Sequence, residues 1–317
     1  MDTSTRPRGP QPERQLGATR AALALMCLFF ATACVESRAA TKQAVRAAAA
    51  RRVAARLASG VLRVTAIPDE NPDALQRKNA LLSAYLSDRL GLEVEFLPVA
   101  DYGAAVQALI SGQVDFAWLG GFTYVQAKRQ AGAVAVVMRA SDQHFKSAFI
   151  AHEDSGIDAM KDLRGKRFAF GSKSSTSGRL MPQHFLSEKF QLDAKVDFAE
   201  RPVFSGAHDA TVLMVSSRMV DAGALNFKTW ERLSKANDQV RLIWTTPPYV
   251  DYTWAASPAV PAALRGRFAS AFMAMNQAEH AALLELQSAE RYVAAKPGLW
   301  EAIERVGLSS GLLKPER

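Results

Sequence analysis

The chain has 317 residues, 49% of them hydrophobic and 22% charged, so it is long enough for two domains and can bury a sizeable core. Its formal net charge is +8, but residues 1–59 hold ten Lys or Arg and three acidic residues, which leaves 29 basic and 28 acidic residues elsewhere. A nearly neutral body lacks the basic face that binds phosphate backbones, so the composition argues against a nucleic-acid partner.

The amino terminus has the layout of an export signal. Residues 21–33 follow a basic leader and contain no charge, a run that is too short to span a bilayer and typical of a signal-peptide core. We therefore predict a signal peptide over residues 1–34 and a periplasmic protein. Ala31-Thr32-Ala33 suits ordinary cleavage, whereas Cys34 after small residues resembles a bacterial lipobox in which Ala31 replaces the usual Leu. We favour lipidation of Cys34, with simple cleavage as the alternative.

Residues 35–59 are rich in Ala and Arg and have almost no large apolar face, which predicts a tether or a loose helix. The chain has two cysteines, Cys27 in the signal core and Cys34 at its end. The body that follows has no thiol for a disulfide or a cysteine metal site. We expect no metal and no cofactor, and a membrane contact only through the lipid anchor.

From residue 61 onward, short apolar runs alternate with helical patterns, which predicts an α/β fold with mostly parallel strands. The predicted strands are 61–67, 93–97, 114–119, 167–170, 221–225 and 240–244. The predicted helices are 74–90, 102–110, 122–131, 180–190, 209–217 and 229–235, with a helical tail from 262 onward.

Two further strand-like segments, 147–152 and 252–256, each join one set of strands and helices to the other. Two such crossings predict two α/β lobes joined by a hinge. Residues 60–147 and 250–317 would form lobe I, and residues 148–249 would form lobe II. A ligand would then bind in the cleft between the lobes, near the carboxyl ends of their strands.

The turn at residues 171–178, Gly-Ser-Lys-Ser-Ser-Thr-Ser-Gly, lies between a predicted strand and a predicted helix. Such a turn leaves the first N–H groups of the helix free to bind an oxyanion, with the positive end of the helix dipole behind them. Ser and Thr are equally favoured there as helix caps that bind nothing. The turn alone does not decide between these two roles.

Several motifs occur together in one order. They are Ala66-Ile67-Pro68-Asp69-Glu70, Val99-Ala100-Asp101-Tyr102, residues 115–121 (DFAWLGG), residues 174–178 (SSTSG) and residues 204–209 (FSGAHD). The set resembles the phosphate/phosphite/phosphonate-binding family of ABC-importer solute-binding proteins over roughly residues 60–310. Within the family it is most similar to the branch described as selenate-binding proteins, with trivalent-arsenic sensors as another relative.

The resemblance implies a type II periplasmic-binding-protein fold that closes on a small oxyanion and delivers it to a membrane permease. It also implies a set of ligand-binding residues: Tyr102, Gly120, Gly121, Ser175, Thr176, Ser177, Gly178, His208 and Asp209. In this scheme Asp209 orients His208 or caps its helix. Trp118, Asn226, Tyr249 and Tyr252 are expected as further ligands or cleft walls, with core packing or hinge packing as their alternatives.

The chain departs from the phosphonate binders in having Gly120-Gly121 where they have Gly-Pro, and a neutral Asn226 near the place of an acid that holds a substrate amine. An aminophosphonate is therefore a poor candidate. The lack of cysteine in the body removes the thiolate that would bind trivalent arsenic. We expect selenate or selenite first, then phosphite or phosphate, then phosphonates.

Two other functions compete with import. The same cleft could serve a periplasmic sensor subunit that signals to a histidine kinase. A cleft hydrolase is the remote alternative, because Ser, His and Asp all occur near the proposed cleft, but the sequence has neither a Gly-x-Ser-x-Gly elbow nor a nucleotide P-loop ending. We therefore predict that the protein is not an enzyme.

Overall fold

The computed structural model describes residues 43–315, so the predicted signal peptide and Cys34 lie outside the described residues. The chain divides into two compact units, which meet between Val45 and Arg46. Of the first unit only residues 43–45 are described, and they are helical. Everything reported below belongs to the second unit.

Residues 46–58 are helical and pack on the body, where the sequence predicted a tether or a loose helix. Ala49 and Val53 lie one turn apart and are buried. The guanidinium of Arg56 forms an ion pair of 2.6 Å with the fully buried carboxylate of Asp115, and a Cβ on Gly112 would come within 2.7 Å of the Ala49 carbonyl oxygen. Small side chains and one ion pair thus dock a helix that lacks a large apolar face.

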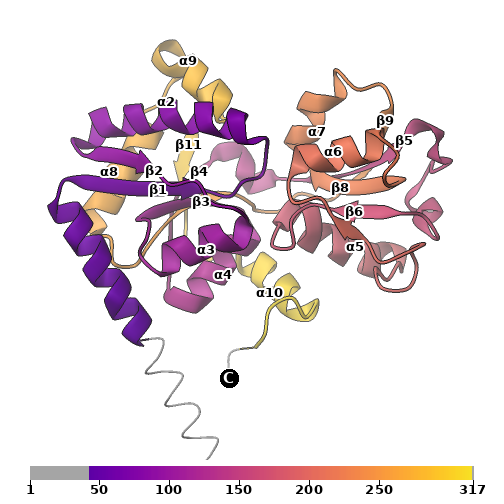
Figure 1. Ribbon diagram of the computed structural model, residues 1–317, viewed down its shortest axis with the longest axis horizontal. Coiled ribbons are helices and arrows are strands. Elements are labelled where there is room, and N and C mark those ends of the chain that lie inside the picture. The colour runs from indigo at the N-terminus through magenta and orange to yellow at the C-terminus, as the bar shows by residue number, and fades with distance from the viewer. Residues whose placement is uncertain (1–42, 316–317) are drawn as a thin grey trace, which may run out of the picture. The chain divides into compact units, whose positions relative to one another are not determined.

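Lobe I is built on a six-stranded sheet of strand order β11-β4-β10-β3-β1-β2 (Figure 1). The strands are β1 (Val61–Ala66), β2 (Glu93–Phe96), β3 (Phe116–Leu119), β4 (Val134–Arg139), β10 (Thr253–Ala256) and β11 (Tyr292–Ala294). Its helices are α2 (Pro72–Leu90), α3 (Tyr102–Ile110), α4 (Gly121–Ala131), α8 (Ala262–Met273), α9 (Gln277–Leu286) and α10 (Glu301–Ser309).

Lobe II is built on a five-stranded sheet of strand order β7-β6-β8-β5-β9. The strands are β5 (Ser147–His152), β6 (Phe168–Phe170), β7 (Val203–Phe204), β8 (Ala222–Asn226) and β9 (Val240–Thr245). The π-helical turn η4 (Thr176–Leu180) runs directly into α5 (Met181–Phe190), and α6 (His208–Ser216) and α7 (Phe227–Ser234) follow. Short 3-10 turns at η1 (Ala140–His144), η2 (Glu153–Ser155) and η3 (Met160–Leu163) complete the connections.

The α/β class is confirmed, but the prediction of mostly parallel strands is wrong. Strand β1 pairs in parallel with β2 and β3, and β6 with β7 and β8. The strands β10, β11 and β5 form only antiparallel pairs among the described residues. These strands enter a sheet after the chain has crossed over or turned back, so they run against the strands of the βα units. Every predicted strand and helix lies within two residues of an observed one, but β4, β7 and β11 were not predicted.

The chain crosses between the two sheets twice, before β5 and before β10. The crossings are joined to each other, because the backbone N–H groups of Phe145 and Tyr249 donate to each other's carbonyl oxygens at 2.8 and 2.9 Å. This pairing ties the two connections side by side and gives the predicted two-crossing hinge.

The strands of lobe II are covered on both faces. Along β5, Phe149 and Ala151 pack in one apolar cluster and Ala148 and Ile150 pack in another. This explains why the strand is a continuous apolar run without alternation.

The core of lobe I centres on Trp254 and on Phe116, whose ring stacks on Phe268 with centroids 3.8 Å apart. Within the described residues, none of the helices is both long and apolar enough to cross a membrane.

Candidate functional site

Polar side chains from both lobes are buried together where the lobes meet. Lobe I contributes Asp69, Tyr102, Asp251 and Tyr252, and lobe II contributes Ser175, Thr176, Ser177, His208 and Asn226; each of these is at most 8% exposed. Buried polar groups are costly unless they are hydrogen-bonded. Each of these groups therefore needs a hydrogen-bond partner, from the protein or from a ligand.

The turn after β6 is held by a close approach of two glycines. The Gly171 N–H donates to the Gly178 carbonyl at 2.8 Å, and a Cβ on Gly178 would lie 3.0 Å from both the Gly171 Cα and the Ser175 Oγ. Ser175 caps the helix, because its hydroxyl accepts from the Gly178 N–H at 2.9 Å. The capping role thus falls to Ser175, which leaves the hydroxyls of Thr176 and Ser177 for other partners.

The start of α4 in lobe I faces this turn. The Gly121 N–H donates to Asp251 Oδ1 at 2.7 Å, and the Phe122 N–H donates to Thr176 Oγ1 of lobe II at 2.9 Å. A Cβ on Gly120 would lie 3.1 Å from that same Thr176 oxygen. The absence of a Cβ at Gly120 therefore lets the two helix N-termini, each the positive end of a dipole, come together across the lobes.

His208, the first residue of α6, is fully buried and contacts lobe I. Its Nδ1 accepts from the Asn226 N–H at 3.2 Å, so in the neutral ring the proton sits on Nε2. That Nε2 is 3.4 Å from the Tyr102 hydroxyl and 3.3 Å from the Tyr252 hydroxyl. Burial lowers the pKa of His208 to about 4, so at neutral pH the ring is an uncharged donor at Nε2.

Asn226 and Tyr252 connect the histidine to the lobe I wall. The Asn226 side-chain amide donates to the Tyr252 hydroxyl at 3.2 Å, and the Tyr252 ring stacks on Trp118 with centroids 5.5 Å apart. The Arg139 guanidinium lies 5.0 Å from the centroids of both rings and is held by two hydrogen bonds to Asp142, of 2.7 and 2.8 Å. Trp118 and Tyr252 are thereby fixed as a rigid aromatic wall.

Two buried carboxyl groups have raised pKa values. Burial raises the pKa of Asp251 to about 7, although the Gly121 N–H and the Thr176 side chain act in the opposite direction. Burial and the neighbouring Glu70 raise the pKa of Asp69 to about 6, and Lys78 partly offsets this. Near neutral pH the site therefore gains or loses a proton easily.

Two side-chain oxygens of the cluster have no hydrogen-bond partner among the described residues although they are fully enclosed. They are Ser177 Oγ and Asp251 Oδ2. One is a hydroxyl that can donate or accept, and the other is a carboxyl oxygen that pairs with a donor when charged. This is the pattern expected where a ligand completes the hydrogen bonds.

Comparison with known proteins decides the family. Residues 64–300 match the family described as ABC transporter, phosphonate, periplasmic substrate-binding protein. The chain belongs to this family. The architecture above is accordingly that of a type II periplasmic binding protein.

Individual relatives of this phosphonate-family protein bear different ligand names. It is 37% identical over 268 residues to the probable ABC transporter phosphite binding protein PhnD1 of Prochlorococcus marinus (strain MIT 9301), covering 78% of this chain and 89% of the relative. It is 29% identical over 212 residues to the phosphate-import protein PhnD of Mycolicibacterium smegmatis, covering 62% of this chain and 66% of the relative.

Solved structures agree with the fold. The structure of Prochlorococcus marinus PhnD1 in complex with methylphosphonate has a TM-score of 0.77 and 34% identity to this chain, and covers 80% of this chain and 99% of the solved chain. A binding protein component of an ABC phosphonate transporter from Pseudomonas aeruginosa has a TM-score of 0.72 at 22% identity, covering 79% and 86% respectively.

The structure brings most of the predicted site residues of this phosphonate-family protein to one place. Eleven of them lie at the seam described above: Tyr102, Gly120, Gly121, Trp118, Ser175, Thr176, Ser177, Gly178, His208, Asn226 and Tyr252. Tyr249 is buried beside the hinge, with its hydroxyl 2.7 Å from that of Ser147.

Asp209 is the exception among the predicted ligands. It is half-buried, its Oδ1 accepts from the Ala210 N–H at 2.8 Å, and it lines an outer groove with Pro72 and Leu213. Among the described residues no hydrogen bond joins it to His208. Consecutive helical side chains point about 100° apart, so when His208 faces the seam Asp209 cannot. Of its two expected roles, bonding at the helix start fits the structure and orienting His208 does not.

Sequence reasoning missed Asp251 as a site residue. The only local signal was an acid between two singled-out aromatics, Tyr249 and Tyr252, after Pro247-Pro248. An acid at a hinge is not unusual, and its burial arises only when α4 and η4 pack against it. Within the part of the chain that the structure describes, no group of three or more His, Cys, Asp or Glu is placed to hold a metal ion.

Proposed function

We propose that this protein binds a small phosphorus oxyanion, phosphite or methylphosphonate, between its lobes and delivers it to the permease of an ABC importer. The observation that carries the proposal is the pair of enclosed oxygens without partners, Ser177 Oγ and Asp251 Oδ2, within a ring of hydrogen-bond donors. The membership of the phosphonate-binding family gives the class of ligand and the transporter partner.

The hydrogen-bond donors around these two oxygens can bind the oxygens of a compact oxyanion. These donors are the hydroxyls of Thr176, Ser177, Tyr102 and Tyr252, the His208 Nε2–H, and the first N–H groups of η4. The Gly121 and Phe122 N–H groups at the start of α4 are already bonded to Asp251 and Thr176. Burial raises the pKa values of both tyrosines well above 10, so they stay protonated and donate. Uncharged donors and helix N-termini stabilise an anion without the desolvation cost of a buried lysine or arginine.

Asp251 favours a ligand that shares a proton with it. Two negative charges in contact repel, so either the ligand brings an acidic O–H or the carboxyl is itself protonated. Hydrogenphosphite and the methylphosphonate monoanion carry such a proton near neutral pH. Selenate, the anion of a strong acid, carries none and depends on protonation of Asp251.

These considerations change the order of ligands expected from the sequence. Relatives named for phosphite and for phosphate, and a solved relative in complex with methylphosphonate, favour phosphorus oxyanions over selenium oxyanions. An aminophosphonate stays disfavoured, because Asn226 is neutral and both of its side-chain groups are taken, by Tyr252 and by the N–H groups of Lys228 and Thr229.

The periplasmic location and the lipid anchor rest on the amino terminus. The family is periplasmic, and the uncharged segment at 21–33 fits export. We propose lipidation at Cys34, which mass spectrometry of the membrane fraction would detect as a diacylglyceryl modification. An unmodified N-terminus released into the soluble fraction would show simple cleavage instead.

Calorimetric titration of the mature protein, purified without phosphate buffers, tests the ligand assignment. Phosphite, methylphosphonate, phosphate, selenate and 2-aminoethylphosphonate form the panel. We expect phosphite or methylphosphonate to bind most tightly, and Ser177→Ala to weaken that binding by about tenfold or more, because one hydrogen bond to a charged group is lost. Ser174→Ala, in the same turn but half-exposed, is the matched control. Tightest binding of selenate, or equal effects of both substitutions, would contradict the assignment.

A further inference from the structure

Helix α7 links the binding site to the outer edge of the seam between the lobes. Its N-cap is Asn226, whose Oδ1 accepts from the N–H groups of Lys228 and Thr229 at 2.8 and 3.2 Å. The same side chain donates to Tyr252 in the site. Any movement of α7 relative to lobe I therefore also moves a residue of the buried polar cluster.

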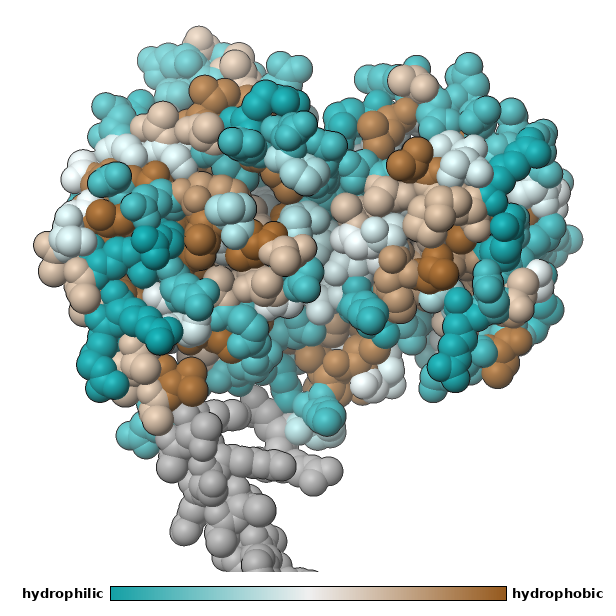
Figure 2. Space-filling model, in the orientation of Figure 1, coloured by the Kyte–Doolittle hydropathy of each residue, from teal (hydrophilic) through white to brown (hydrophobic). Residues whose placement is uncertain are grey.

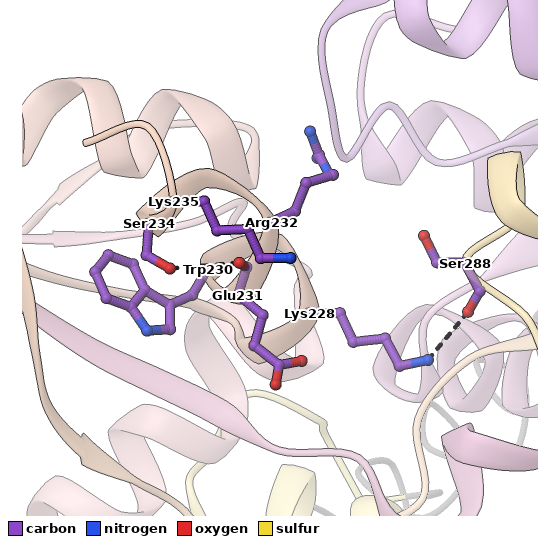
Figure 3. Close-up of a pocket in the computed structure, with 7 residues that line it drawn as sticks. All are labelled: Lys228, Trp230, Glu231, Arg232, Ser234, Lys235 and Ser288. Atoms are coloured by element: carbon purple, nitrogen blue, oxygen red, sulfur yellow. Dashed lines mark hydrogen bonds between the residues drawn. The ribbon is translucent and has the colours of Figure 1, made fainter.

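One face of α7 reaches across to lobe I. Lys228 and Arg232 are four residues apart and so lie on the same face of the helix. In Figure 3 the Lys228 side chain extends from α7 to Ser288, and Arg232 lies one turn further along. Both residues line a groove of about 580 Å³ at the surface. They also line a cavity of about 20 Å³, which Asn226, Trp118 and Asp69 share. Figure 2 shows a notch in the surface between α2 and α7, with hydrophilic residues on its α2 side.

The contacts of this face are specific and span the two lobes. The Lys228 ammonium donates to Ser141 Oγ at 2.7 Å and to the Ser288 carbonyl at 3.0 Å. The Arg232 guanidinium forms an ion pair of 2.9 Å with Glu70, which also accepts from the Thr229 hydroxyl at 3.4 Å. Ser141, Ser288 and Glu70 all belong to lobe I, so these bonds exist only while the lobes are together.

We propose that Lys228 and Arg232 form a latch that holds the lobes closed over the ligand and thereby sets how fast the ligand leaves. The inference rests on the proposed function. Neither residue needs to touch the ligand, because a contact made only in the closed state favours the bound form and slows opening. They act on the ligand indirectly, by holding α7 and its N-cap Asn226 against lobe I.

Lys228 and Arg232 are expected to slow dissociation of the ligand to different extents. Lys228 is half-buried and makes two hydrogen bonds from a charged group, the kind of contact that contributes most. Arg232 keeps 51% of its side chain exposed, and exposed ion pairs contribute little. We expect Lys228→Met to speed dissociation about tenfold and Arg232→Gln about two- to threefold.

Stopped-flow measurement of methylphosphonate or phosphite association and dissociation on the mature protein tests the latch. Lys235→Met is the matched control, because Lys235 lines the same groove on the same helix but has no lobe I partner among the described residues. The latch predicts a faster dissociation rate for Lys228→Met and an unchanged association rate. A slower, salt-dependent association that Lys235→Met shares would overturn it and show attraction of the anion by surface charge instead.

A double-mutant cycle on Glu70→Gln and Arg232→Gln provides a second readout that does not depend on Lys228. The latch predicts that the double variant dissociates no faster than Glu70→Gln alone, because Arg232→Gln removes a bond that Glu70→Gln has already removed, together with the Thr229 contact. Independent, multiplying effects contradict it. If the wild type binds no phosphorus oxyanion, the proposed function fails; if it binds but all variants release ligand at the wild-type rate, only the latch fails.

Discussion

At the scale of single residues, the proposed site depends on buried polar groups that do not have all their hydrogen-bond partners among the described residues. Asp251 is fully buried, accepts from the Gly121 N–H with one carboxyl oxygen, and has no hydrogen-bond partner for the other among the residues that the structure describes. His208 is equally buried and is kept uncharged. Neither arrangement improves the stability of the folded chain, so both point to binding as the reason for their presence.

Asp251 makes the stability of the folded protein depend on pH. The pKa of Asp251 is about 7 in the folded protein and 3.8 as an ordinary aspartate, so above pH 3.8 the folded state binds more protons at this site than the unfolded state. Its contribution to stability therefore falls as pH rises, by about 1.4 kcal/mol between pH 6 and pH 8. We expect Asp251→Asn to gain that amount relative to the wild type over the same interval.

Urea unfolding of both ligand-free proteins at pH 6 and pH 8 measures this difference. The comparison with the variant is needed because His208 changes the stability in the opposite direction. Its pKa is lowered from 6.5 to about 4, so its contribution to the free energy of unfolding rises with pH until about pH 6.5. A stability difference between the two proteins that does not change with pH would show that Asp251 is already charged below pH 6.

At the scale of elements, the binding turn is a junction of strand, turn and helix whose shape is set by small residues. Its motif was visible in the sequence because hydroxyls and glycines follow an apolar run. The sequence could not show that Ser175 is the cap or that the π-helical turn η4 precedes α5, because both depend on the approach of Gly178 to Gly171. For residues 35–59 the sequence left open a tether or a loose helix. It could not show that residues 46–58 pack on the body, because this packing depends on the ion pair of Arg56 with buried Asp115.

The approach of the two glycines predicts the effect of a methyl group. In Gly178→Ala the added Cβ would lie 3.0 Å from the Gly171 Cα and the Ser175 Oγ. This is tighter than most Cβ contacts and one of the two atoms belongs to the backbone, so the turn must shift by a few tenths of an ångström. We expect a loss of about 1–3 kcal/mol of stability and at least tenfold weaker ligand binding. Thermal unfolding and calorimetric titration measure the two effects.

Gly266→Ala is the control for this prediction, because it lies inside α8 where a Cβ would meet nothing within 4 Å. Alanine there is expected to stabilise the helix by roughly 0.5–1 kcal/mol and to leave ligand binding unchanged. Equal behaviour of the two variants would mean that the turn accommodates a side chain, and that its glycines are not required for its shape.

At the scale of the whole second unit, two lobes are joined by a hinge and by a seam of polar contacts. The apolar cluster of lobe I also takes in Leu180 and Met181 of lobe II, whereas the sheet of lobe II buries two further clusters of its own. Hydrogen bonds such as Phe122 N–H to Thr176 and the His208 N–H to the Asp69 carbonyl, at 2.9 Å each, join them across the site. A ligand that replaces or adds to such bonds couples the two lobes.

This coupling predicts the behaviour on heating. With methylphosphonate at about 100 times its Kd, the folded protein should gain about 2.7 kcal/mol, which raises Tm by several degrees. The proposed site takes residues from both lobes, so differential scanning calorimetry should show both lobes melting at the raised temperature. Two separate transitions of which only one moves would place the ligand within a single lobe.

The α/β class, the positions of the main strands and helices, the two crossings and the family could be predicted from the sequence, because these follow from hydrophobic periodicity and from ordered local motifs. Three properties could not be predicted: the direction in which β5, β10 and β11 pair, the separation of Asp209 from His208, and the burial of Asp251. These properties arise from packing between segments far apart in the chain. Periodicity along one segment reports which of its faces is buried, but it does not report which partner covers that face, and the partner is what shifts a pKa or completes a site.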